Sequence, residues 1–203
     1  MQVTLIQQTP APIETISKIA SICYDSNPKN PLGLVKHLYK NGHHSVFEHI
    51  YFTFKIESIS RACSHQLVRH RMCSFTQRSQ RYCSEDGFKV VIPKTLQYID
   101  KKNANENLMD EINGMYNEAQ SLGVPNEDAR YLLPNACETS LYLSCNLREL
   151  IHMANERLCV RAQWEIRDLV KQMVALVEPE LQFMLVPKCK SGRIICNSPC
   201  GGK

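Results

Sequence analysis

Apolar residues at every second position mark a small number of strands in this chain. The clearest case is the alternation of Ile50, Phe52, Phe54 and Ile56 with more polar neighbours, which predicts a strand over 50–57 with one buried face. Weaker β-like patterns predict further strands at 3–6, 90–92 and 139–145. The expected strands are therefore few and far apart in the sequence.

Apolar residues three and four positions apart predict helices over much of the remaining chain. The helices are expected at 13–24, 32–39, about 59–71, 96–122, 127–133, 147–158 and 162–177. Asn146, with Glu149 three positions later, is close to a capping box and favours a helix start there. Because strands and helices do not alternate regularly, we expect an α+β fold with a mixed or antiparallel sheet and several packed helices.

Two segments receive a more detailed prediction. The 96–122 helix is expected to bury one face, formed by Leu108, Ile112, Met115 and Ala119. After the helix that ends near Arg71, the chain is expected to continue as a loop to Tyr82.

Length and composition indicate an ordinary soluble protein. The 203 residues suffice for a real core, and 43% hydrophobic with 22% charged residues is typical of globular domains. The first fifteen residues lack the basic stretch and apolar run of a signal peptide. No apolar run approaches the roughly 18 residues of a membrane span. We therefore expect a cytoplasmic protein with no membrane partner.

The ten cysteines are expected to be thiols, mostly buried, because nothing indicates secretion. Cys189, Cys196 and Cys200 differ, since they lie in a tail at 188–203 rich in Gly, Pro and Lys. This tail has no CxxC pair and no evident fourth ligand, so a frayed, mildly reactive tail is favoured. The alternative is a zinc-binding interaction module, which metal analysis with and without residues 189–203 would decide.

Three histidines cluster just before the 50–57 strand: His43, His44 and His49. Their spacing at a loop-to-strand junction lacks the single helical face on which an HExxH motif gathers its ligands. We therefore expect no metal site in this chain.

Positive charge is concentrated between Arg69 and Tyr82, in RHRMCSFTQRSQRY, although the net charge is only +4. No acid lies between Glu57 and Glu85. The charges are arginines interleaved with Ser, Thr and Gln, and arginine grips phosphate in a bidentate fork. Nucleic-acid binding remains an alternative, which a steep salt dependence of DNA or RNA binding would favour. Because only Phe75 and Tyr82 could stack on bases, a small phosphorylated ligand fits better.

Other basic residues have positions consistent with a ligand site. Arg157 lies at the edge of the apolar stripe of its helix, where it either meets an anion or extends its head to solvent. Arg148 and His152 share another face of that helix, and Arg130 follows Glu127. The chain has no GxGxxG, Walker A or GxSxG motif, so side chains would have to hold any nucleotide or flavin.

Five segments resemble those of one known family. Arg69, His70, Arg71 and Ser79 form RHR, seven residues, then Ser, which resembles the signature of the flavin-dependent thymidylate synthases, the ThyX family. HSVFEHIYFTF, EDARYLLP, NLRELIHM and RAQWEIR are similar to further family segments, in the family's order. The resemblance covers about residues 3–187, and we interpret residues 1–187 as one domain followed by the tail at 188–203.

The resemblance implies an enzyme that methylates dUMP to dTMP. The carbon would come from 5,10-methylenetetrahydrofolate and the reducing equivalents from NADPH by way of FAD. Reduced flavin delivers hydride to the uracil ring in this family, so no protein nucleophile is expected. The resemblance also implies a homotetramer with active sites shared between subunits, and no nucleic-acid partner.

Site residues carry over from the family position by position. The FAD side is implied to include Ser45, Arg69, His70, Arg71, Gln77, Asn146, Arg148 and His152. The dUMP side is implied to include Gln66, Arg69, Gln77, Ser79, Arg81, Arg130 and Arg157. Arg157 matches the arginine that favours ionisation of the uracil N3, and His43 matches a histidine near folate and flavin. The chain departs from many members at Thr76-Gln77, where they have Asn-Glu.

Overall fold

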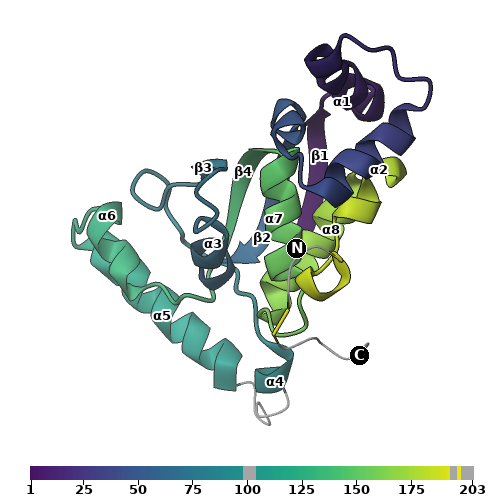
Figure 1. Ribbon diagram of the computed structural model, residues 1–203. Coiled ribbons are helices and arrows are strands. Elements are labelled where there is room, and N and C mark those ends of the chain that lie inside the picture. Colours follow the sequence, from purple (N-terminus) through teal and green to yellow (C-terminus); the bar gives the residue numbers. More distant parts are fainter. Residues whose placement is uncertain (98–103, 193–195, 198–203) are drawn as a thin grey trace.

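One antiparallel sheet forms the centre of the molecule. The structure is a computed structural model that describes residues 1–97, 104–192 and 196–197. The sheet consists of β1 (Gln2–Gln8), β2 (Tyr51–Ser60), β3 (Ser74–Gln77) and β4 (Glu138–Asn146), in the spatial order β1-β2-β4-β3 (Figure 1). This arrangement confirms the α+β class, with an antiparallel sheet.

The two central strands carry the buried face that the alternation predicts. In β2, Phe52, Phe54 and Ile56 are fully buried, and opposite them in β4 lie Leu143 and Cys145. Side chains on successive strand residues point to opposite faces, so this register commits one face of the sheet to the core.

Helices cover this face and extend the molecule beyond it. They are α1 (Pro12–Ser21), α2 (Pro31–Asn41), α3 (Arg61–Leu67), α4 (Lys94–Gln97), α5 (Ala104–Ser121), α6 (Asn126–Ala129), α7 (Leu147–Arg157) and α8 (Trp164–Leu176). Short 3-10 turns occur at η1 (Ile22–Tyr24), η2 (Ser45–His49), η3 (Arg130–Leu132), η4 (Pro179–Met184) and η5 (Lys188–Lys190). α7 packs against α8, and α8 against β1, whereas α5 lies beside α6 at a distance from the sheet (Figure 1).

The junction between β2 and α3 differs from the prediction. Ile59, which was expected to begin a helix, belongs to β2, because a bulge with Ser58 in the left-handed region (φ 55°) restarts the pairing after Ile56. The helix that was expected to reach Arg71 ends at Leu67. The basic segment from Arg69 therefore lies outside α3.

Pairing with distant parts of the chain also decides two segments that the sequence pattern misplaced. The expected loop to Tyr82 contains β3, in which Phe75 pairs with Leu143. The strand expected over 90–92 is reduced to an isolated bridge between Val90 and Cys137. Both differences depend on pairing partners that are distant in the chain. A local sequence pattern therefore could not predict either of them.

The prediction of the buried face of the long helix was wrong for two of its four residues, whereas Ile112 and Ala119 are half-buried. Leu108 is 48% and Met115 56% exposed, whereas Tyr116 is fully buried. The Tyr116 hydroxyl accepts a hydrogen bond from the backbone N–H of Glu85, so α5 is held by a loop and not by the sheet. α5 starts at Ala104, and residues 98–103 of the expected helix lie outside the described residues.

The nine described cysteines form no disulfide with one another, in line with the expected thiols, but only Cys63, Cys137 and Cys145 are buried. The first residues of the tail are not frayed, because the η5 turn packs against α7. Cys189 and Cys196 are half-buried, and Cys200 lies outside the described residues. Among the described helices, none is long and apolar enough to cross a membrane.

Candidate functional site

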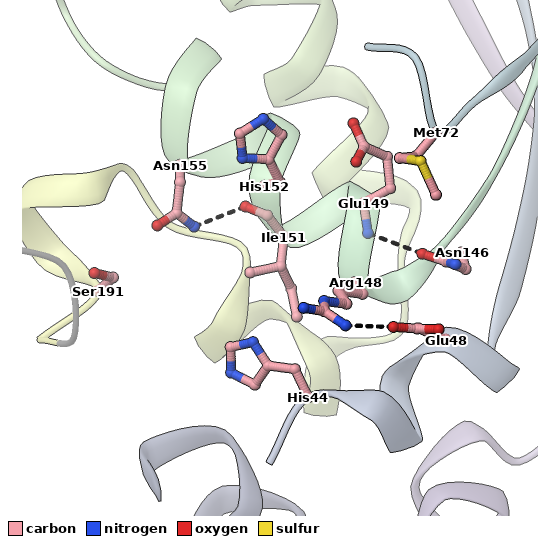
Figure 2. A pocket seen from close by; sticks show the side chains of 10 residues that line it. All are labelled: His44, Glu48, Met72, Asn146, Arg148, Glu149, Ile151, His152, Asn155 and Ser191. Atoms are coloured by element: carbon pink, nitrogen blue, oxygen red, sulfur yellow. Dashed lines mark hydrogen bonds and ion pairs between the residues drawn. The ribbon is translucent and has the colours of Figure 1, made fainter. Parts of the chain in front are cut away.

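A hollow of about 540 Å³ opens along the first turns of α7 (Figure 2). Asn146 ends β4 and caps α7, since its side chain accepts a hydrogen bond from the Glu149 backbone N–H at 2.9 Å. This cap directs Arg148 and His152 into the hollow. The complete lining is His44, Glu48, Met72, Asn146, Arg148, Glu149, Ile151, His152, Asn155 and Ser191.

The polar groups of the hollow suit a ligand with both anionic and hydrogen-bonding parts. The Arg148 guanidinium forms an ion pair with Glu48 of η2 and is half-exposed (Figure 2). The Asn155 side chain is buried and donates to the Ile151 carbonyl oxygen at 2.7 Å. Its oxygen, Oδ1, is buried without a hydrogen-bond partner in the described part of the chain. Such an orphaned acceptor at a hollow is suited to receive a ligand N–H.

Behind this hollow lies a buried histidine with two polar partners. His70 is 5% exposed, and its Nδ1 lies 3.1 Å from Glu149 Oε1. Arg157, in the last turn of α7, donates from Nε to the His70 Nε2 at 3.0 Å. The Nη2 of Arg157 lies 3.5 Å from the Gln66 carbonyl oxygen. The structure thus brings Gln66, His70 and Arg157 together, and Arg157 does not simply extend into solvent.

Three residues of the predicted nucleotide side also gather. Arg81 donates from Nε to Glu127 Oε2 at 2.8 Å, and this hydrogen bond raises the Arg81 pKa. The Arg130 Nε donates to the Glu127 carbonyl oxygen at 3.0 Å. The Ser79 hydroxyl oxygen accepts from the Arg81 backbone N–H at 3.2 Å. Arg81 therefore contacts the side chain of Glu127, Arg130 contacts its backbone, and the Ser79 hydroxyl contacts the backbone of Arg81.

A hollow of about 430 Å³ adjoins this group, between Arg130 and a further arginine, Arg61. Burial lowers the Arg61 pKa, and its Nε is buried with no hydrogen-bond partner among the described residues. Arginine stays charged in proteins even so, which makes this side of the molecule suited to an anion. The sequence pattern did not single out Arg61.

Gln77 is held by two hydroxyl groups. Its Nε2 donates to Ser64 Oγ and to Thr139 Oγ1, both at 3.1 Å. The Ser64 hydroxyl donates in turn to the Arg61 carbonyl oxygen, so it can only accept from Gln77. An amide can donate to both hydroxyl oxygens, whereas a carboxylate at this position could not donate to Ser64.

The other predicted residues lie apart from these contacts. Arg69 and Arg71 are exposed on either side of buried His70, and neither guanidinium makes a hydrogen bond to another described residue. Ser45 and His43 are exposed beside the 540 Å³ hollow without lining it, whereas their neighbour His44 does.

Several lining residues were missed by the sequence reasoning. Glu149 was noticed only as a capping partner, although its side chain contacts His70. Glu48 and Asn155 gave no signal of their own, because each owes its place to a contact with α7 or within it.

Comparison with known proteins supports one family. The family model of the thymidylate synthase complementing protein matches residues 4–181. The flavin-dependent thymidylate synthase of Geobacter sulfurreducens is 42% identical over 95% of this chain and 90% of its own length. That of Pyrococcus furiosus is 42% identical over 86% of this chain and 78% of its own length.

A solved structure shares the fold. ThyX from Helicobacter pylori, crystallised with FAD and dUMP, superimposes with a TM-score of 0.74. It is 24% identical and covers 94% of this chain and 99% of its own. The match of the family model over most of the chain, joined by these long relatives, shows that the chain belongs to the thymidylate synthase complementing protein family, that of the flavin-dependent thymidylate synthases.

Proposed function

We propose that this chain is a flavin-dependent thymidylate synthase that converts dUMP to dTMP. The observation that carries this function is the half-buried Arg157 guanidinium, held by His70, whose other partner Glu149 lines the larger hollow. Family membership supplies the reaction class. The carbon donor is 5,10-methylenetetrahydrofolate and the reductant is NADPH.

Arg157 is the catalytic residue in this proposal. Its positive charge favours ionisation at the uracil N3, where negative charge develops. Because the side chain is half-buried, water screens its charge less than at an open surface. Electrostatic stabilisation of this kind is commonly the largest contribution a protein makes to a reaction.

The residues around the larger hollow fit a flavin nucleotide. Arg148 offers a cation for a pyrophosphate, and Asn155 an unpartnered buried oxygen for an N–H group. Reduced FAD supplies the hydride when it is bound. The residues that we propose to contact it are Ser45, Arg69, His70, Arg71, Gln77, Asn146, Arg148 and His152.

The arginines around Glu127 fit the phosphate of dUMP. Arg81 and Arg130 would exchange part of their contact with Glu127 for the ligand, as charge-assisted bonds to phosphate are strong. The residues that we propose for dUMP are Gln66, Arg69, Gln77, Ser79, Arg81, Arg130 and Arg157, with His43 on the folate side.

We also infer a homotetramer with shared active sites, located in the cytoplasm. The exposed guanidinium groups of Arg69 and Arg71 are free to reach a ligand held by another subunit. Leu122 and Tyr131 are exposed at 77% and 83%, and contact with another subunit would bury them. The described cysteines form no disulfide with one another, and such thiols are typical of a reducing compartment such as the cytoplasm.

The first experiment is a visible spectrum of the purified protein, repeated under anaerobic conditions with NADPH, with and without dUMP. We expect a flavin spectrum that bleaches on reduction, followed by dTMP formation when methylenetetrahydrofolate is added. A protein that neither binds added FAD nor forms dTMP would overturn the proposal.

Replacing Arg157 tests the catalytic assignment. Arg157→Ala is expected to keep the fold and the bound flavin and to lower dTMP formation by at least about 10²-fold, the usual effect of removing one group that stabilises developing charge. Lys171→Ala removes an exposed cation from α8 and serves as the control. Near-normal turnover by Arg157→Ala would show that this residue has another role.

A further inference from the structure

His70 is held against α7 by two side chains about two turns apart on that helix. Glu149 lies 3.1 Å from its Nδ1, and the Arg157 Nε lies 3.0 Å from its Nε2. Both His70 and Glu149 are buried, so water does not substitute for either partner. His70 therefore connects a carboxylate that lines the larger hollow to the proposed catalytic arginine.

The two contacts allow only one position for the ring proton. An arginine side chain donates hydrogen bonds and cannot accept them, so the His70 Nε2 must be unprotonated to accept from Arg157. The Glu149 carboxylate accepts, so the proton must be on Nδ1. The hydrogen bond made by one ring nitrogen thus sets what the other nitrogen can do.

We propose that Glu149 is a positioning residue for Arg157, acting through the His70 tautomer. By keeping the proton on Nδ1, Glu149 leaves Nε2 as the acceptor that fixes the Arg157 guanidinium. This inference rests on the proposed function, because it takes the position of Arg157 to matter for dTMP formation.

Loss of the Glu149 carboxylate would turn the hydrogen bond between Arg157 and His70 into a repulsive contact. With no acceptor at Nδ1, the proton is free to move to Nε2, where an N–H would face the N–H of Arg157. Two donors 3.0 Å apart repel, so the guanidinium would leave its position. A displacement of about 1 Å in a reacting group can cost roughly 10²-fold in rate.

His70 and Glu149, together with His152, are also spaced as metal ligands could be. Metal binding is therefore the alternative to the positioning role. One ligand atom each from His70, Glu149 and His152 lie within 4.8 Å of one another. A metal ion on Nδ1 would need its lone pair and would move the ring proton to Nε2. That proton would oppose Arg157, so metal binding and the positioning contact exclude each other.

The direct test is the tautomer of His70 in the full-length protein, without substrates. Two-bond ¹⁵N–¹H correlation spectra of protein labelled in its histidine rings distinguish the two nitrogens, and the His70 signals are those lost in His70→Asn. We expect the proton on Nδ1 in the wild type and in Glu149→Gln, whose carbonyl oxygen still accepts. In Glu149→Leu we expect it on Nε2 or exchanging.

Activity gives the second readout. Glu149→Leu is expected to lower the kcat of dTMP formation roughly 10²-fold, and Glu149→Gln to restore most of it. The matched control is Glu156→Leu, which removes an exposed carboxylate from the same helix and should change neither the tautomer nor kcat.

The outcomes separate this inference from the proposed function. A wild-type Nε2–H tautomer, or stoichiometric binding of Zn²⁺ that shifts the His70 signals, would overturn the positioning role whatever the activity. Full turnover by a folded Glu149→Leu would also overturn it. A wild type with the expected tautomer that forms no dTMP would instead refute the proposed function.

Discussion

Single side chains beside the site owe their chemistry to burial. The Cys63 thiol lies in α3, and burial raises its pKa to about 12 even though nearby Arg157 opposes the shift. Burial likewise raises the Cys137 pKa to about 11. Because the thiolate is the reactive form, these cysteines are packing residues at neutral pH and not nucleophiles.

Alkylation rates test this view of the thiols. At pH 8 a thiol with a pKa near 12 is thiolate in a fraction on the order of 10⁻⁴, so Cys63 is expected to resist iodoacetamide in the folded protein. Exposed Cys23 serves as the internal reference and should react quickly. Peptide mass spectrometry after timed labelling gives both rates, and comparable rates at the two positions would refute the prediction.

At the scale of elements, a buried carboxylate holds α3 and α8 together. The Glu165 side chain is 2% exposed and accepts from the Ser60 backbone N–H at 2.7 Å and from its hydroxyl at 2.6 Å. Ser60 also caps α3 by accepting from the Cys63 N–H. Since α3 carries Gln66 and leads into His70, this contact positions the residues that meet Arg157.

Glu165→Ala is therefore expected to lower the free energy of unfolding by roughly 3 kcal/mol, because it leaves a buried donor unpaired and removes bonds to a charged group. Urea denaturation measures the change. The control Glu156→Ala, at an exposed position, should stay within about 0.5 kcal/mol of the wild type. An effect of Glu165→Ala as small as the control's would mean that the contact does not hold α3.

At the scale of the whole molecule, the candidate site is distributed over segments distant in the sequence. The larger hollow combines η2, the turn after α3, the start of α7 and Ser191 of the C-terminal segment (Figures 1 and 2). The nucleotide side, with Arg81 and Arg130, lies near α6. A ligand that spans both needs the assembled fold, and in our proposal neighbouring subunits as well.

The proposed assembly is directly measurable. Light scattering after size-exclusion chromatography is expected to give a mass four times the 23.3 kDa of the chain. The mass should persist on dilution to concentrations used in assays, because active sites shared between subunits require it. An active protein that runs as a monomer would exclude the shared-site proposal while leaving the reaction class intact.

The sequence by itself determined the elements whose signals are local. Alternation over β2 and the Asn146 cap of α7 depend on neighbouring residues, and the ordered family segments depend on residue identity alone. These features identified the α+β class, the start of the helix that carries Arg157, and the family.

Only the tertiary structure decided features that depend on distant partners. β3 exists because it pairs with β4, and α5 buries Tyr116 and not Met115 because a loop meets that side. The Glu149–His70 and His70–Arg157 contacts join residues 79 and 87 positions apart. A hydrogen bond across such a separation depends on how the chain packs, and no local spacing of residue types encodes it.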